Sequence, residues 1–271
     1  MLMDCAAYFR RVGFAGIPRP DLATLLRLQR CHLQTIPYEN FDVQLNKRLT
    51  LSVDDAFAKL VTAERGGWCY EMNGLFGGVL EAIGFRVMPM TGAVMRSVRG
   101  ETAIGNHLVL RVELDQPYLA DVGLADGPIE AIPMQEGTYR QGWRTMRLER
   151  IDNDWWRFHN ADNAMAPSFD FQHRPADWAV LQLKCDWQQT SAESRFVQNA
   201  ICVRHRPDDI IALIGCVLKT ISERGMTERV VVSAAEYEDV LRSLFGIRLS
   251  ITTDLWQQIL RRHELVLQQK A

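Results

Sequence analysis

Apolar side chains recur at helical intervals near the start of the chain. Residues 21–33 carry leucines three and four positions apart, which is the spacing of one helix face. A second apolar stripe follows Ser52, a residue type that favours helix starts. A third stripe covers residues 69–83 and ends before Gly84, a typical helix stop. These patterns predict a helical bundle in residues 1–84.

The period changes from helical to alternating in the next part of the chain. The stretch "HLVLRVEL", which begins at His107, alternates leucine and valine with polar residues, as a half-buried strand does. The stretch "RTMRLERIDNDWWRFHN" predicts a hairpin that turns at residues 152–154. We therefore predict an antiparallel β-barrel in residues 85–190. Residues 191–271 combine strands with helices from about Ala234 onward, and we expect this part to cover the other two as an α/β lid. The predicted fold class is α+β.

Composition narrows the possible partners. The 271 residues carry a net charge of −2 and contain no basic run, which argues against nucleic acid and anionic membranes as partners. Asp4, Arg10 and Arg11 interrupt the start of the chain, where a secretory signal needs an apolar core. The longest apolar stretch, residues 210–218, is too short to cross a bilayer. We expect a cytoplasmic protein that acts on small molecules.

Six cysteines are widely spaced and form neither a C-x-x-C pair nor a cluster with histidine, so we expect no disulfide framework and no metal site. Five are expected to be small buried residues. Cys69 differs because it follows Gly66 and Gly67 at a predicted helix start, where backbone N–H groups favour a thiolate. The glycines would let the chain bend and leave room for a substrate to approach the sulfur. Spacing alone nevertheless favours a structural cysteine over a nucleophile.

His107 and Asp121 could complete a Cys-His-Asp triad, since a carboxylate can orient an imidazole that takes the proton of a thiol. Taken singly, they are better explained as a solvent-facing strand residue and a turn residue. A turn at residues 115–117 would place Asp121 opposite Arg111, about 13 Å out of step with His107 at ~3.3 Å per residue. A loop centred on Leu114 would pair the two directly but has weaker turn chemistry. Hairpin geometry therefore does not establish the contact.

Longer motifs carry more information than these spacings. The strings "IPYENFD" (36–42), "RGGWCYEMNGLF" (65–76), "NHLVL" (106–110), "LADVG" (119–123) and "FGIRLS" (245–250) resemble successive motifs of the arylamine N-acetyltransferases. The resemblance runs over nearly the whole chain. It implies a helical bundle, a β-barrel and an α/β lid, with a cysteine-protease-like triad between the first two.

In that family resemblance, Cys69 is the nucleophile, His107 the base and Asp121 the residue that orients the base. Acetyl-coenzyme A would acetylate the sulfur as a co-substrate, and an arylamine or arylhydrazine would then take the acetyl group, so that no cofactor is permanently bound. This is ping-pong covalent catalysis.

The resemblance also implies weaker roles. Glu39 and Arg65 match an ion pair beside the active site, the alternative being a surface pair of little energetic weight. Glu71 and Asn73 are expected to support the helix start without being catalytic.

The acceptor pocket is where the chain departs from the family. Tyr38, Val94 and Leu124 match pocket positions, although apolar residues there can simply be core. The family pattern D-V-G-F-G reads "DVGLA" here, so Leu124 replaces an aromatic residue and Ala125 a glycine. This change affects acceptor preference and the approach of coenzyme A, for which Gly127 could supply flexibility instead.

Three rival functions remain at this stage. A related amide synthase would use the same triad with a different acyl thioester. A thiol hydrolase or transglutaminase-like enzyme shares the order of the triad, but the papain-type signature around its cysteine is absent. The third is an inactive binding protein of the same fold, which the complete triad disfavours.

Overall fold

The computed structural model describes residues 3–268, and helices dominate its first part. The three predicted helices are present, the second of them continuing into a π-helical turn over Ala58–Thr62. Gly84 adopts a left-handed conformation (φ +109°) and ends the third helix. The helices of this part are α1 (Cys5–Val12), α2 (Leu22–Thr35), α3 (Phe41–Gln44), α4 (Val53–Phe57) and α5 (Cys69–Ile83).

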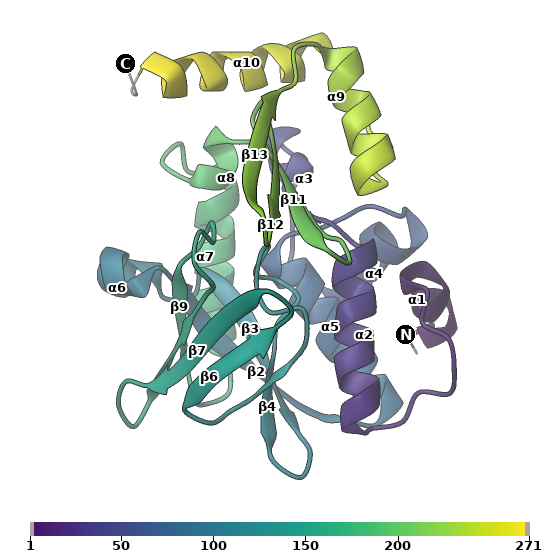
Figure 1. The fold of residues 1–271 in the computed structure, drawn as a ribbon, viewed down its shortest axis with the longest axis vertical. Coiled ribbons are helices and arrows are strands. Elements are labelled where there is room, and N and C mark those ends of the chain that lie inside the picture. The colour runs from purple at the N-terminus through teal and green to yellow at the C-terminus, as the bar shows by residue number, and fades with distance from the viewer. Residues whose placement is uncertain (1–2, 269–271) are drawn as a thin grey trace.

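Eight antiparallel strands form the central sheet, in the order β5-β4-β3-β2-β9-β8-β7-β6. Its two edge strands, β5 and β6, are joined by only residues 134–136. The sheet therefore curls into a nearly closed barrel (Figure 1). This confirms the predicted α+β class with an antiparallel barrel. The strands are β2 (Arg86–Val94), β3 (His107–Glu113), β4 (Pro117–Ala120), β5 (Ile132–Pro133), β6 (Gly137–Gln141), β7 (Arg144–Arg150), β8 (Trp155–His159) and β9 (Ser168–Gln172).

Strand β3 has apolar residues on both faces, which is why it lies at the centre of the structure. Leu108 and Leu110 belong to the core shared with α5, whereas Val109 faces the barrel interior with Phe169 and Phe171. The barrel and the helices are thus packed together along this strand. Between β2 and β3 the chain forms α6 (Arg96–Arg99) and a 3₁₀ turn (Gly100–Ala103).

The barrel strands end at Gln172, and the predicted range 85–190 closes with a helix that the alternating pattern did not predict. This helix, α7 (Trp178–Thr190), starts where the Asp177 carboxylate accepts the N–H groups of Ala179 and Val180. The short helix α8 (Arg195–Gln198) follows it.

A second antiparallel sheet combines one strand from the N-terminal helical part with four strands from the C-terminal part of the chain. Its order is β1-β10-β11-β12-β13, and β1 (Tyr38–Glu39) comes from the helical part. The other strands are β10 (Ile201–His205), β11 (Asp209–Ile214), β12 (Val217–Ser222) and β13 (Gly225–Val230). Helix α9 begins at Ala234 as expected and ends at Val240, a π turn covers Leu241–Phe245, and α10 spans Thr253–Gln268. Figure 1 shows α9 and α10 at one end of the molecule, beside this sheet.

Candidate active site

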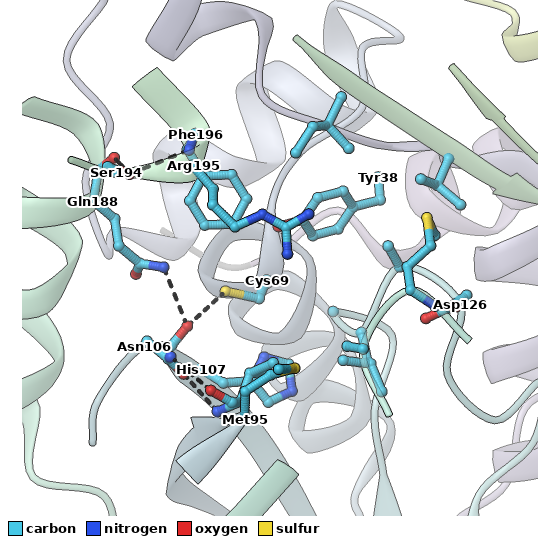
Figure 2. Close-up of a pocket in the computed structure, with 18 of the residues that line it drawn as sticks. Tyr38, Cys69, Met95, Asn106, His107, Asp126, Gln188, Ser194, Arg195 and Phe196 are labelled. Atoms are coloured by element: carbon cyan, nitrogen blue, oxygen red, sulfur yellow. Dashed lines mark hydrogen bonds between the residues drawn. The ribbon is translucent and has the colours of Figure 1, made fainter. Parts of the chain in front are cut away.

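Cys69 is the first residue of α5 and lines a cavity of about 270 Å³. The preceding backbone N–H, that of Trp68, donates to the Glu71 carboxylate (3.2 Å) and so fixes the helix start. The sulfur donates a hydrogen bond to the Asn106 carbonyl at 3.7 Å (Figure 2). It is therefore held next to the chain segment that carries His107.

His107 and Asp121 are in direct contact and almost fully buried, with the His107 Nε2 and Asp121 Oδ2 atoms 2.8 Å apart. The explanation of His107 as a solvent-facing residue is wrong. Both expected strand registers are also wrong, because Leu110 pairs with Ala120 and Arg111 with Leu119. In this register Asp121 lies two residues away from the position opposite His107. The two expected registers gave offsets of four residues and of zero. The two residues share a face of the sheet, and their side chains span the remaining offset of about 6.6 Å.

A hydrogen-bond network holds the Asp121 carboxylate in place. Its Oδ1 atom accepts from Asn73 Nδ2 (2.7 Å) and from the N–H groups of Gly123 (2.7 Å) and Leu124 (3.1 Å). Asn73 also donates to the Leu108 carbonyl (2.6 Å). Helix α5, strand β3 and the loop after β4 are thus tied together at one carboxylate, and Asn73 acts by positioning it.

Sequence reasoning assigned no role to Gly123. A Cβ atom at this position would lie 2.5 Å from Asn73 Nδ2 and 2.7 Å from the Cys69 Cα atom. Only glycine lets the loop after β4 approach the start of α5 this closely. Its place in the "LADVG" motif was the available signal.

The protonation of Cys69 depends on its surroundings. Burial raises the pKa of the thiol, and the Asp121 carboxylate raises it further, whereas the backbone N–H groups of Leu108 and Tyr70 lower it. The predicted effect of the helix start is therefore present but smaller than the effect of burial. A thiolate here needs a cation beside it, and protonated His107 in the same cavity is suited to supply that charge.

The two glycines before Cys69 serve packing, which corrects the expectation that they make room for substrate. A Cβ atom on Gly66 would lie 2.2 Å from the Pro37 carbonyl oxygen, and one on Gly67 would lie 2.9 Å from Glu71 Oε2. The Gly67 carbonyl accepts the Glu39 N–H (2.9 Å), so this segment runs along β1. Protein atoms fill the space that the missing side chains leave.

A buried cluster of charges lies behind the start of α5. Arg65 donates to the fully buried Glu39 carboxylate at 2.7 Å, so the alternative of a surface pair is wrong. Lys59 pairs with Asp42 (2.9 Å) and Glu71 (3.0 Å). Burial raises the pKa of Glu71 to about 7, although Lys59 lowers it. The cluster ties β1, α3 and the turn after α4 to the helix that carries Cys69.

Tyr38, Val94 and Leu124, the residues expected to line an acceptor pocket, line the same cavity as Cys69. Gly127 is not among the lining residues; its N–H donates to the Leu124 carbonyl (2.8 Å) and closes a tight turn. Much of the wall comes from segments that no motif indicated, namely the region around α6, the loop between β8 and β9, and the stretch from α7 to α8. These additional residues include Met95, Arg99, Met165, Trp187, Gln188, Arg195 and Phe196.

Within residues 3–268 no group of three or more His, Cys, Asp or Glu side chains is placed to hold a metal ion. The six cysteines are free. Among the described helices, none combines the length and the apolar character that crossing a membrane requires.

Comparison with known proteins places this geometry in context. A family model described as N-acetyltransferase matches residues 21–254. An arylamine N-acetyltransferase of Mycolicibacterium smegmatis is 35% identical over 262 residues, which cover 92% of this chain and 94% of that protein. One from Escherichia coli (strain K12) is 31% identical over 209 residues, covering 74% of this chain and 73% of that protein.

Solved structures show the same similarity. The M. smegmatis arylamine N-acetyl transferase superposes with a TM-score of 0.85 at 31% identity, covering 95% of this chain and 97% of that chain. Mycobacterium marinum arylamine N-acetyltransferase in complex with CoA superposes with a TM-score of 0.84 at 27% identity, covering 96% of this chain and 98% of that chain.

Proposed function

The chain belongs to the arylamine N-acetyltransferase family, and on that premise we propose that it moves an acetyl group from acetyl-coenzyme A through a Cys69 thioester to an arylamine or arylhydrazine. The observation that carries this proposal is a cysteine at a helix start that lines the same cavity as His107, whose ring is hydrogen-bonded to the buried Asp121 carboxylate.

Acetylation of the enzyme is the first half of the reaction. His107 binds Asp121 through Nε2, so its Nδ1 atom is the one that takes the Cys69 proton. The resulting thiolate attacks the acetyl carbonyl, while backbone N–H groups at the start of α5 stabilise the oxyanion. Collapse of the intermediate breaks the bond to the coenzyme A sulfur, which leaves with the proton from His107.

Deacetylation is the second half. The amine nitrogen attacks the thioester carbonyl, His107 removes one proton from this nitrogen, and the bond to Sγ breaks. The proton returns to the sulfur, and the amide product leaves. Asp121 stabilises the imidazolium in both halves, because its carboxylate is buried against the ring.

Free cations at the mouth of the cavity suit a donor that carries phosphate groups. Arg99 and Arg195 line the cavity and are exposed, and neither pairs with a carboxylate among the described residues, whereas Arg96 binds Glu101 and Asp170. Lys184 lies with its Nζ atom 4.5 Å from the centre of the Trp187 ring. We assign the phosphates of coenzyme A to this basic rim.

Two aromatic rings suit an aromatic acceptor. Tyr38 and Phe196 both line the cavity, with ring centres 6.4 Å apart. Phe196 thus supplies a flat surface against which an arylamine can pack, although position 124 carries leucine. Val94 and Leu124 add apolar surface to the same cavity.

The covalent intermediate tests the proposal. Wild-type protein mixed with acetyl-coenzyme A alone should carry one acetyl group on the Cys69 peptide by mass spectrometry and release free coenzyme A. Cys69→Ala should carry none, and Cys202→Ala, which removes a different buried thiol, should still be acetylated. Adding an aniline should discharge the acetyl-enzyme much faster than water does.

Two other results would redirect the assignment. A folded protein that never acquires the acetyl group would point to a different acyl donor or to an inert binding protein. An acetyl-enzyme that disappears equally fast with and without amine would point to a thioesterase.

A further inference from the structure

Gln188 is a polar side chain in the wall of the active-site cavity that the proposed mechanism does not use. It belongs to α7, is 6% exposed and lines the same cavity as Cys69 and His107. Its Oε1 atom accepts the Tyr70 hydroxyl at 2.6 Å. Its Nε2 atom lies 3.5 Å from the Asn106 carbonyl oxygen, to which the Cys69 sulfur also donates (Figure 2). The Gln188 amide therefore reaches the immediate surroundings of the nucleophile.

The contacts of this amide leave hydrogen-bonding capacity near the sulfur. The Nε2 contact with Asn106 is long, because N–H donors usually lie about 2.9–3.0 Å from their acceptors. The other end of the amide is held by Tyr70, whose single O–H also lies 2.6 Å from the Gly105 carbonyl. This O–H can donate to only one of the two oxygens, so either the oxygen or the nitrogen of the amide can face Tyr70. In both orientations, one polar group of Gln188 is left without a short partner.

Helix α7 connects this amide with the basic rim to which we assign the phosphates of coenzyme A. Lys184 of that rim lies four residues before Gln188, so the two residues share a face of the helix and are about 6 Å apart along its axis. Trp187, which lies between them in the chain, lines the cavity. A donor that extends from the rim to the Cys69 sulfur therefore passes Gln188.

Acetyl-coenzyme A carries an amide next to its reactive group, since only an ethylene link separates the thioester sulfur from an amide nitrogen. An amide has both an N–H donor and a C=O acceptor, so it can pair with Gln188 in either orientation. The oxyanion of the reaction intermediate accepts hydrogen bonds only, so it would fit one orientation alone. The amide of the donor is thus the better partner for this side chain.

We propose that Gln188 is a specificity-determining residue that hydrogen-bonds the amide nearest to the thioester of the acyl donor. This inference rests on the proposed transfer from acetyl-coenzyme A and deepens it, because it defines the class of donor: thioesters of thiols that carry an amide two carbons from the sulfur. Alkyl thioesters of the same length lack this amide and are poorer donors.

Two short donors without the nucleotide test the contact. S-acetyl-N-acetylcysteamine keeps the amide, whereas S-pentyl thioacetate has the same chain length without it. Mass spectrometry gives the second-order rate of Cys69 acetylation by each donor, normalised to the rate of that donor with a free thiol in solution. Wild type should favour the amide donor by about tenfold, the effect of one hydrogen bond to a buried group. Gln188→Leu should lose this preference by slowing the amide donor alone.

Matched variants separate the contact from effects on folding. Gln188→Leu should fold, because the Tyr70 hydroxyl keeps the Gly105 carbonyl as its partner, and circular dichroism checks this. Gln188→Met repeats the test with an unbranched side chain closer in shape to glutamine. Gln182→Leu makes the same change on α7 at a residue that does not line the cavity, and it should keep the preference of wild type.

Three results would overturn the inference. They are a wild type without a normalised preference for the amide donor, a folded Gln188 variant that keeps the preference, and equal slowing of both donors, which would place Gln188 at the reacting atoms instead. In each case the proposed function stands if acetyl-coenzyme A still acetylates Cys69 of the wild type. If no donor acetylates Cys69, both the inference and the proposed function fail.

Discussion

Replacing Asp121 by asparagine should separate orientation of His107 from its activation. Asp121 Oδ1 accepts three N–H groups, from Asn73, Gly123 and Leu124, while Oδ2 faces His107 Nε2. An asparagine has a single oxygen, which preserves most hydrogen bonds if it occupies the position of Oδ1. Its NH₂ group then faces Nε2, and the imidazole must carry its proton on Nδ1. That tautomer cannot take the proton of Cys69.

The network sets the size of this effect. The opposite amide orientation would place NH₂ against three N–H donors, and each buried donor left without an acceptor costs about 1–3 kcal/mol. The unproductive tautomer should therefore dominate. The same change in a Ser-His-Asp triad lowers kcat by about 10⁴-fold, which corresponds to about 5.5 kcal/mol in the barrier. We expect a loss of this order in the rate of Cys69 acetylation, with the fold retained.

Single-turnover acetylation, quenched and measured by mass spectrometry, provides the assay. Asp170→Asn is the matched control, because Asp170 is also fully buried and binds Arg157 (2.7 Å) but does not line the active-site cavity. It should acetylate Cys69 at close to the wild-type rate if it folds. A folded Asp121→Asn enzyme that acetylates within about tenfold of wild type would refute the reasoning from the tautomer.

Three further predictions follow from the same geometry. Iodoacetamide at neutral pH should label Cys69 much faster than Cys31 or Cys202, and acetyl-coenzyme A should protect it; equal labelling in peptide maps would remove the case for an activated thiol. Leu124→Phe should change the ranking of amine acceptors in steady-state kcat/KM more than the rate of Cys69 acetylation, since this side chain lines the cavity in which we propose that the acceptor binds; the reverse result would exclude contact between Leu124 and the acceptor. Because the pKa of Glu71 is raised from 4.5 to about 7, its stabilising contribution is present below about pH 4.5 and lost as pH rises through 7. Glu71→Gln should flatten the unfolding free energy over this range in urea titrations, and an unchanged slope would show that another group titrates.

Local patterns in the sequence determined the elements that carry the site. Helix α5 covers residues 69–83 as predicted, because its apolar spacing and the left-handed Gly84 act within a few residues of each other. The alternation from His107 likewise predicted β3. Family motifs, which are also contiguous strings, indicated Cys69, His107 and Asp121 and predicted their roles.

Tertiary structure alone decided how these residues meet. The turn chemistry of the β3–β4 hairpin suggested two registers, and the structure has a third between them, which brings Asp121 to His107 with Asn73 of α5 holding the carboxylate. The cavity wall was equally hidden, because Phe196 is more than 100 residues from Cys69 in the chain and no local period marks it. Hydrophobic periodicity records which face of an element is buried. It does not record which distant side chains pack against that face, because this depends on long-range contacts that form only when the whole chain is folded.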